Sequence, residues 1–421
     1  MSSGRPVAGR GGRSARRWIL ARCERALVAL AQIGTVHSYS AAMNRILAPR
    51  LIDELRLRPA EPTDLDRLME LEHRVFAVDR ISRRGFRRFL HSRHAVLLVA
   101  TRGDLLAGYA LVLFRDNSEI ARLYSIAVDP GSGRQGVGVR LLAAAEQAAI
   151  DRERMFMRLE VHENNASAIA RYRKSGYSQF GHHAHYYQDR GHALRFQKRL
   201  SPHLARLALA PPYFHQTTEF TCGPACVMMA LAWADPSLRP EEVFEFTLWR
   251  EATTIFMNSG PGGCEPYGLA VTLRRHGVYP TIHVSRPGPY FLDTVHSDAH
   301  RRIMTLTQDR FRRDADELRI PTHLSSVDYP VLARAFDSDG VAIVLVSGYH
   351  MMRRRTPHWV FAFGREGRHI LVHDPAAEAD DQGLAKGPNT YAVPWRAFEH
   401  MTRFGRDGLQ AAILIWKGPP R

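Results

Sequence analysis

The 421-residue sequence predicts two domains of mixed helix and strand content, the first α/β and the second α+β. In residues 53–200, strand-like and helix-like segments alternate, which is typical of a mixed sheet flanked by helices. In residues 213–417, helical segments come first and strand-like segments follow, which predicts a helical half and an antiparallel sheet. Residues 201–212 contain three prolines and are predicted to be a linker. A chain of this length can bury a separate core in each domain.

The first domain opens with the strand-like stretch LRLRPA at 55–60, and Thr63 is expected to cap the helix that follows. A second short helix is expected near 82–92. Two strands should then form a hairpin around Gly103-Asp104. The remaining elements are expected as a strand at 119–130, a helix at 137–150, a strand at 155–161, a helix at 165–176 and two final strands ending near 200.

In the second domain, apolar periodicity separates a helical half from a strand-rich half. The expected helices lie at 222–233, 240–250 and 266–276, and the polar stretch 286–326 is predicted to be a helical insertion. The expected strands lie at 340–349, 358–364, 369–375 and 411–417.

The net charge of +16 is concentrated at the N-terminus. Residues 1–50 contain nine arginines and a single acidic residue, Glu24, so a basic, unfolded arm is predicted over 1–52. The arm has three open interpretations: contact with RNA or the ribosome, a targeting peptide, or a dispensable leader with Met43 as the true start.

Cysteine content and hydropathy argue against a disulfide-rich secreted protein and against a membrane-spanning one. Four cysteines in a chain of this length are too few for a disulfide scaffold, and they favour a reducing cytoplasm. No apolar run reaches the roughly 18 residues that a membrane span needs. We therefore expect a cytoplasmic protein.

Glycines lie between a strand and a helix in GSGRQGVGVRLL, residues 131–142. Backbone amides at such a turn can hold a pyrophosphate at the positive end of the helix. About twenty residues later comes RLEVHENNASAIARYRKSGY, residues 158–177. Its Leu-Glu-Val strand, its Asn, its Ala-Ile pair and its Tyr before Gly-Tyr resemble the GNAT acyltransferases, most closely the ribosomal-protein N-terminal alanine acetyltransferases. The resemblance covers about 53–200.

This resemblance implies acetyl-CoA as cofactor and a peptide or protein amine as acceptor. It makes Glu160 the general base, acting through water, and Tyr172 the general acid that protonates the leaving thiolate. The implied cofactor-binding residues are Ile126, Ala127 and Val128 for the acetyl and pantetheine groups, Arg134, Gln135, Gly136, Val137 and Gly138 for the pyrophosphate, and Asn165 from the family motif. The chain departs from the family pattern in having Gly133 where Arg or Gln is usual and His162 where Arg is usual.

The stretch QTTEFTCGPAC, residues 216–226, places Cys222 at the expected start of a helix. A helix N-terminus favours a thiolate, and the side-chain amide of Gln216 could stabilise an oxyanion beside it. A thiolate nucleophile also needs an imidazole with an orienting partner. His358 opens one expected strand and Asp374 ends the next, so an antiparallel pair would bring them together.

The order Gln, Cys-Gly-Pro-Ala-Cys, His-Trp-Val and Asp-Pro-Ala resembles the papain-like peptidases that process bacteriocins after double-glycine leaders, over about 213–417. It implies that Cys222, His358, Asp374 and Gln216 are catalytic. The chain departs in its 136-residue spacing from Cys222 to His358 and in lacking the usual transporter segment. Two alternatives remain open: His350 or His373 as the base, and a zinc site built from Cys222, Cys226, Cys264 and a histidine.

The sequence thus predicts a bifunctional enzyme. One domain would acetylate a peptide or protein amine, and the other would cleave a peptide or amide bond. The alternative is an acetyltransferase whose second domain binds peptides without cleaving them.

Overall fold

The structure, a computed structural model, describes residues 54–116, 118–132, 136–202, 204–257, 260–347, 356–376 and 389–419. Several predictions lie outside the described residues: the arm at 1–52, the pyrophosphate contacts of Arg134 and Gln135, and the alternative base His350. No helix within the described ranges is long and apolar enough to cross a membrane.

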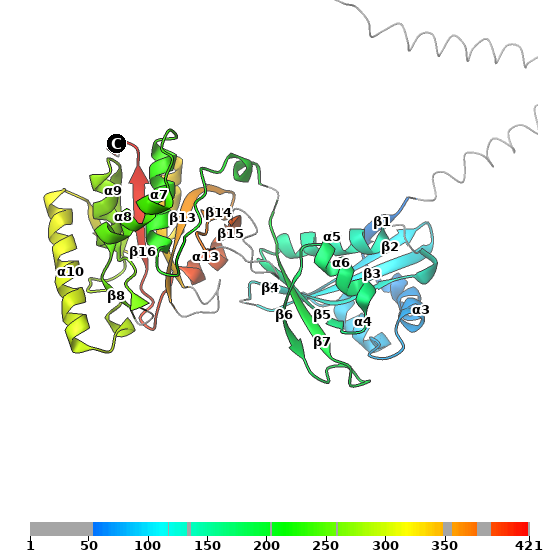
Figure 1. Cartoon of the computed structure of the whole chain (residues 1–421). Coiled ribbons are helices and arrows are strands. Elements are labelled where there is room, and N and C mark those ends of the chain that lie inside the picture. The colour runs from blue at the N-terminus through cyan, green and yellow to red at the C-terminus, as the bar shows by residue number, and fades with distance from the viewer. Residues whose placement is uncertain are drawn as a thin grey trace, which may run out of the picture.

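The first domain is built on a seven-stranded mixed sheet, as the sequence predicts (Figure 1). Its strand order is β1-β2-β3-β4-β5-β7-β6, and β4 and β5 are parallel whereas the other neighbours are antiparallel. The strands are β1 (Arg56–Pro59), β2 (Ala95–Arg102), β3 (Leu105–Phe114), β4 (Ile120–Val128), β5 (Phe156–His162), β6 (Ser178–His183) and β7 (Ala193–Arg199).

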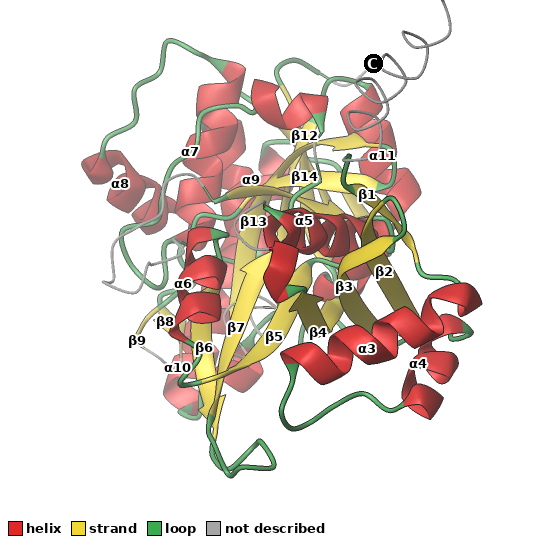
Figure 2. Ribbon diagram, turned by 90° about the vertical axis from the view of Figure 1, so that its right-hand side faces the viewer, coloured by secondary structure: helices red, strands yellow, loops and turns green. Residues whose placement is uncertain are grey.

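Helices cover both faces of this sheet (Figure 2). On one face lie α3 (Leu65–Val75) and α4 (Arg83–Leu90), and on the other α5 (Val137–Ile150) and α6 (Ala166–Lys174). The expectation that Thr63 caps the first helix is wrong. Pro62 instead begins a short 3-10 turn, η1 (Pro62–Asp64), and the side chain of Asp64 accepts a 2.8 Å hydrogen bond from the backbone NH of Glu61.

Strands β4 and β5 separate along their length. Their register pairs 120–123 with 156–159, and it ends at Leu123 and Leu159 although β4 continues to Val128. An irregularity at Tyr124 in the pairing of β4 with β3 marks the same point. A bulge of this kind bends the strand that carries it. At the end of β4, the backbone groups that point towards β5 therefore face a gap in the sheet, while those on the other side stay paired with β3.

The second domain contains another seven-stranded sheet, of order β11-β10-β16-β12-β13-β14-β15. All neighbours are antiparallel, as predicted, except β10 and β11, which are parallel. The strands are β10 (Tyr279–Val284), β11 (Thr322–Leu324), β12 (Val341–Ser347), β13 (Pro357–Glu366), β14 (His369–His373), β15 (Thr390–Pro394) and β16 (Ala411–Trp416), with a separate pair β8 (Phe256–Met257) and β9 (Gly260–Pro261).

Helices also line both faces of the second sheet. One layer contains α7 (Cys222–Ala234), α8 (Glu242–Ala252), α9 (Pro266–Arg275) and α10 (Asp298–Glu317), and the other contains α11 (Tyr329–Asp337) and α13 (Trp395–Met401). Helix α7 is buried from Cys222 to Ala232, so the core fixes the position of its first residue. Helix α10 lies within the stretch predicted to be an insertion. Short 3-10 turns complete the fold: η2 (Pro130–Ser132), η3 (Ala205–Leu209) and η4 (Leu292–Thr294).

The two domains share a packed junction. Met155, which precedes β5, is buried in a core cluster whose other fully buried members all come from the second domain, Tyr391 among them. The guanidinium of Arg199 at the end of β7 lies 4.0 Å from the centre of the Tyr391 ring and donates a 2.5 Å hydrogen bond to Oδ1 of Asn389. Asn389 in turn donates to the carbonyl of Ala376. The junction thus reaches the loop that follows β14.

Candidate active sites

A cavity of about 960 Å³ lies where β4 and β5 diverge. Its lining includes most of the described residues that the sequence assigns to the first site: Ile126, Val128, Gly138, Glu160, Asn165 and Tyr172. Ala127 points to the other face of the sheet, where it is buried against the α3 and α4 layer, so it could contribute only its backbone. Val137 is buried in the core beneath α5. Asn165 caps α6 by accepting a 3.1 Å hydrogen bond from the NH of Ala168.

The start of α5 fits a pyrophosphate. Gly136 has a left-handed backbone with φ of 74°, which glycine adopts without strain. The NH groups of the first turn of a helix have no partner within the helix, so they can bind an anion. A Cβ on Gly138 would lie 2.9 Å from Nη1 of Arg171, so this guanidinium sits directly against the turn. The turn thus offers both backbone donors and a positive charge.

Glu160 and Tyr172 both face the cavity, but in different environments. Glu160 accepts a 2.9 Å hydrogen bond from Nε of Arg122, and Nε of Arg195 lies 3.7 Å from its other oxygen. Tyr172 belongs to α6 and is buried in the core on the inner face of that helix. Burial raises the pKa of Tyr172 to about 12, although the charge of Arg171 opposes the change. Its hydroxyl therefore keeps its proton at neutral pH, as a general acid must.

Sequence reasoning missed three polar residues that face the same cavity or support its wall: Glu72, Tyr109 and Ser125. Glu72 is only 1% exposed. One signal for Glu72 was present, because it lies four residues after Leu68 on the buried face of α3, where an apolar residue is usual. Tyr109 and Ser125 gave no such signal, since tyrosine and serine occur in any half-buried strand.

A hydrogen bond joins two loops that both line this cavity. The backbone NH of Gln188 donates a 3.2 Å hydrogen bond to the carboxylate of Asp79. Asp79 belongs to the loop between α3 and α4, and Gln188 to the loop between β6 and β7. Tyr186, from the second loop, accepts a 2.6 Å hydrogen bond from Arg122 on β4. These contacts fix both loops in place along the rim of the cavity.

In the second domain, the structure brings Cys222, His358 and Asp374 together as predicted from the sequence. Nε2 of His358, at the start of β13, lies 2.6 Å from Oδ1 of Asp374, just after β14. The two strands are antiparallel neighbours, and Gly367, with a φ of 56°, lies in the turn that joins them. Cys222 is the first residue of α7. Because Nε2 faces Asp374, the other ring nitrogen, Nδ1, is available to the sulfur.

The pKa of His358 shows the electrostatics of this cluster. Burial alone would lower that pKa, but the charge and hydrogen bond of Asp374, together with a hydrogen bond to Cys222, raise it to about 10. His358 is 2% exposed, so water screens these interactions little. The imidazole is therefore protonated at neutral pH, in position to pair with a thiolate.

Gln216 lies in the loop before α7, and its backbone NH donates to the carbonyl of Pro375, next to Asp374. Its side-chain Nε2 donates a 2.6 Å hydrogen bond to the carbonyl of Thr218. Its Oε1 is buried without a hydrogen-bond partner among the described residues. An amide NH₂ carries two hydrogens, so one donor remains free for an oxyanion.

The alternative catalytic base and the alternative zinc site fit the structure less well than the cluster of Cys222, His358 and Asp374. His373 is hydrogen-bonded to the carbonyl of Pro211 and to Thr390, and burial lowers its pKa to about 4. Cys226 and Cys264 are fully buried, and burial raises the pKa of both thiols well above the ordinary value. Within the part of the chain that the structure describes, no group of three or more His, Cys, Asp or Glu side chains could hold a metal ion.

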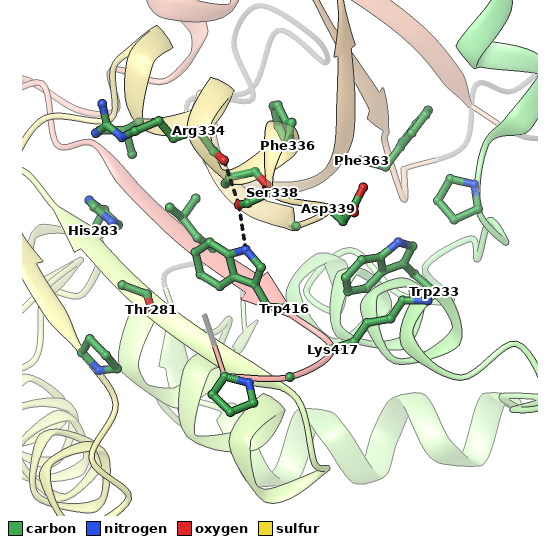
Figure 3. A pocket seen from close by; sticks show the side chains of 18 of the residues that line it. Trp233, Thr281, His283, Arg334, Phe336, Ser338, Asp339, Phe363, Trp416 and Lys417 are labelled. Atoms are coloured by element: carbon green, nitrogen blue, oxygen red, sulfur yellow. Dashed lines mark hydrogen bonds between the residues drawn. The ribbon is translucent and has the colours of Figure 1, made fainter. Parts of the chain in front are cut away.

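A larger cavity, of about 1810 Å³, lies elsewhere in the second domain and contains none of the predicted site residues (Figure 3). Trp233, at the far end of α7 from Cys222, and Trp416 of β16 line it. Nε1 of Trp416 donates to Oγ of Ser338, which in turn donates to the carbonyl of Arg334. At 1.5 Å per residue, Trp233 lies about 16 Å along the helix from Cys222.

Comparisons with known proteins agree with this division. Residues 64–177 match the model of the Acetyltransferase (GNAT) family, and residues 211–416 match the Peptidase_C39 like family. A curated protein from Mycobacterium leprae, described as "Uncharacterized protein ML0378", is 33% identical over 137 residues. That match covers 31% of this chain, and the chain spans only about a third (36%) of the relative's length.

Solved structures match the first domain. The ribosomal-protein-S18-alanine N-acetyltransferase from Escherichia coli is 27% identical, with a TM-score of 0.33, and the match covers 36% of this chain and 97% of that one. The ribosomal-protein-alanine N-acetyltransferase from Brucella melitensis is 25% identical, with a TM-score of 0.31, and the match covers 34% of this chain and 99% of that one.

Proposed function

Since residues 64–177 form an acetyltransferase domain of the GNAT family and residues 211–416 a Peptidase_C39 like domain, we propose that this chain is a bifunctional enzyme acting on peptides. The first domain transfers an acetyl group to a peptide or protein α-amine, and the second hydrolyses a peptide or amide bond. The observation that supports the proposal is that each domain brings its proposed catalytic side chains together: Glu160 and Tyr172 line one cavity, and His358 bonds Asp374 and Cys222 in the other domain.

For the first reaction, acetyl-CoA is the cofactor of the family, and when bound it supplies the acetyl group and a thiol leaving group. The amides at the end of β4 would hold the acetyl carbonyl and pantetheine, and the start of α5 with Arg171 would hold the pyrophosphate. Tyr172 gives its proton to the leaving sulfur. Glu160 takes up a proton from the acceptor nitrogen through water, with Arg122 and Arg195 fixing its position.

The joined loops at the cavity rim favour an α-amine over a lysine within a chain. The hydrogen bond from Gln188 to Asp79 ties one loop to the other, and Tyr186 is fixed beside it by Arg122. A chain end can enter beside the joined loops, whereas a lysine in the middle of a peptide would need room for both flanking segments.

For the second reaction, the sulfur of Cys222 attacks the amide carbonyl as a thiolate. The protonated His358 then donates its proton to the leaving nitrogen, and Asp374 holds the ring by the 2.6 Å hydrogen bond to Nε2. The Gln216 side chain and the Cys222 backbone NH would stabilise the oxyanion. A water molecule completes hydrolysis by attacking the thioester.

Mass spectrometry of a peptide library, incubated with and without acetyl-CoA, tests both halves. We expect peptides with a free α-amine to gain one acetyl group and Nα-blocked lysine peptides to gain none. Tyr172→Phe should lower the transfer and Cys222→Ser should abolish cleavage. Failure of the wild-type protein to acetylate any amine would refute the first assignment. Cleavage that survives Cys222→Ser would refute the second, and binding of peptides without cleavage would favour a non-catalytic second domain.

A further inference from the structure

A chain of hydrogen bonds leads from the acceptor cavity to a buried carboxylate. Oγ of Ser125, on β4, lies 2.8 Å from the hydroxyl of Tyr109 on β3. The Tyr109 hydroxyl donates a 2.5 Å hydrogen bond to Oε2 of Glu72 on α3. Ser125 and Glu72 both line the cavity of about 960 Å³. Side chains from three different elements thus form one continuous hydrogen-bonded path that begins at Ser125 in the cavity wall and ends at the carboxylate of Glu72.

Glu72 is bound by neutral donors. Its Oε1 accepts a 2.7 Å hydrogen bond from the backbone NH of Ile81, and its Oε2 accepts from Tyr109. This differs from Glu160, whose oxygens face Arg122 and Arg195. An ionised carboxylate that is buried without an ionic partner is costly, so such a group readily accepts a proton.

The charges around Glu72 agree with that description. Burial raises its pKa above the ordinary value for glutamate, while the hydrogen bonds from Ile81 and Tyr109 and the more distant charges of His73 and Arg80 lower it in part. Burial and the charge of Glu72 raise the pKa of Tyr109 far above its ordinary value, so Tyr109 can pass a proton on but does not stay ionised.

We propose that Ser125, Tyr109 and Glu72 form a proton relay that takes a proton from the acceptor ammonium in the acetyl-transfer reaction. The proposal rests on the proposed function of the first domain as an amine acetyltransferase. Ser125 touches the acceptor, and Tyr109 and Glu72 act through it.

The relay balances the protons of the reaction. The ammonium gives one proton to Oγ of Ser125, while the hydroxyl proton of Ser125 moves to Tyr109 and that of Tyr109 to Glu72, which becomes a neutral acid. The freed amine forms the bond to the acetyl carbon as the bond to sulfur breaks, and Tyr172 protonates the sulfur. The second proton of the nitrogen passes through water to Glu160 and returns to Tyr172. Glu72 releases its proton to solvent.

Glu72 also has a structural role, because its bond to Ile81 holds the loop before α4, and the test must separate the two roles. Glu72→Gln keeps an acceptor for Ile81 but cannot take a proton. Tyr109→Phe keeps the ring that packs edge-on against Phe86, with centroids 5.5 Å apart, but breaks the path. Ser125→Ala breaks the path at the cavity. Ser82→Ala is the matched control, because it removes the cap that Ser82 gives α4 by accepting from Gly85 and leaves the relay intact.

The measurement is kcat against pH, from thiol release at saturating acetyl-CoA and peptide, with thermal denaturation of each variant. In the wild-type protein we expect kcat to level off by about neutral pH. Without the relay the amine must lose its proton beforehand, so kcat should keep rising through the α-amine pKa of about 8. At pH 7 the relay variants should be slower by roughly tenfold to a hundredfold, and the loss should shrink towards pH 9.

Three outcomes decide the matter. A shifted profile in Glu72→Gln, Tyr109→Phe and Ser125→Ala, with an unshifted one in Ser82→Ala, supports the relay. Transfer by the wild-type protein together with unchanged profiles in the three relay variants would overturn the relay and leave the acetyltransferase assignment standing. No transfer by the wild-type protein to any amine would overturn both.

Discussion

Replacing Asp374 with Asn should remove the charge that keeps His358 protonated. Asn has nearly the same shape and can still accept the 3.0 Å hydrogen bond from the NH of Ala376, so the loop should keep its form. The charge of Asp374 is the largest influence raising the pKa of His358 to about 10. The interval from 6.5 to about 10, at 1.36 kcal/mol per pH unit, corresponds to about 5 kcal/mol favouring the imidazolium.

The magnitude for the thiol follows from this loss. Without a neighbouring imidazolium, an ordinary thiol titrates near pH 8.5, so about one per cent would be ionised at pH 6.5. The alkylation rate of Cys222 should therefore fall roughly a hundredfold at pH 6.5 in Asp374→Asn and rise about tenfold per pH unit up to pH 8.5. In the wild-type protein the rate should change little across this range.

The assay is alkylation by iodoacetamide from pH 5.5 to 9.5, with the modified cysteine located by mass spectrometry. Cys226 and Cys264 serve as internal references, because burial raises their pKa values. His373→Gln is the control, since it changes a neighbouring buried imidazole that contacts Pro211 and Thr390 instead of the cluster. A wild-type rate that climbs tenfold per pH unit between 7 and 8.5, or an Asp374→Asn profile identical to it, would refute the ion pair.

Three further predictions follow from other contacts. Gly136→Ala, at a φ of 74°, should cost about 1 kcal/mol and weaken acetyl-CoA binding measured by calorimetry, whereas Gly181→Ala, near no close neighbour, should not. Met155→Ala should cost about 2–5 kcal/mol in urea unfolding and uncouple the two domains, while Met157→Ala, buried in the first core, should destabilise that domain alone. The pKa of His358 is raised in the folded protein, so its contribution to stability should be complete below pH 6.5 and vanish as the pH rises towards 10. The free energies of unfolding of the wild type and His358→Gln should therefore differ more at pH 6 than at pH 9.5, and an equal difference at both would contradict this.

Local sequence patterns predicted much of the fold. Helix α5 was expected at 137–150 and lies there, because glycines precede a long apolar stretch without a helix breaker. The hairpin at Gly103-Asp104 and the antiparallel pair that carries His358 and Asp374 were likewise expected, since each has a turn flanked by strand-like residues. The grouping of Cys222 with His358 followed from ordered motifs, not from any local propensity.

Other features depend on contacts distant in the chain. Strand β10, which contains Pro280, is not among the strands expected from the sequence, and it is stabilised by antiparallel pairing with β16, more than 120 residues later in the chain. The spacing of Glu72 from Leu68 places it on the buried face of α3, but its hydrogen bonds to Tyr109 and Ile81 come from residues distant in the chain and could not be predicted. The sequence places Met155 at the start of an expected strand of the first domain. In the structure, its side chain packs among buried residues of the second domain.

The contacts around Met155 and Asn389 also limit how the two domains can be separated or fused to other proteins. If the chain were cut within 201–212, the first fragment would expose the apolar side chain of Met155. The second fragment would expose the apolar surface beside Tyr391 that Met155 covers. Arg199 would lose its hydrogen bond to Asn389. Asn389 also donates a hydrogen bond to the carbonyl of Ala376, which lies two residues after Asp374. Fusing either domain to an unrelated domain would therefore require a redesigned domain interface as well as a new linker.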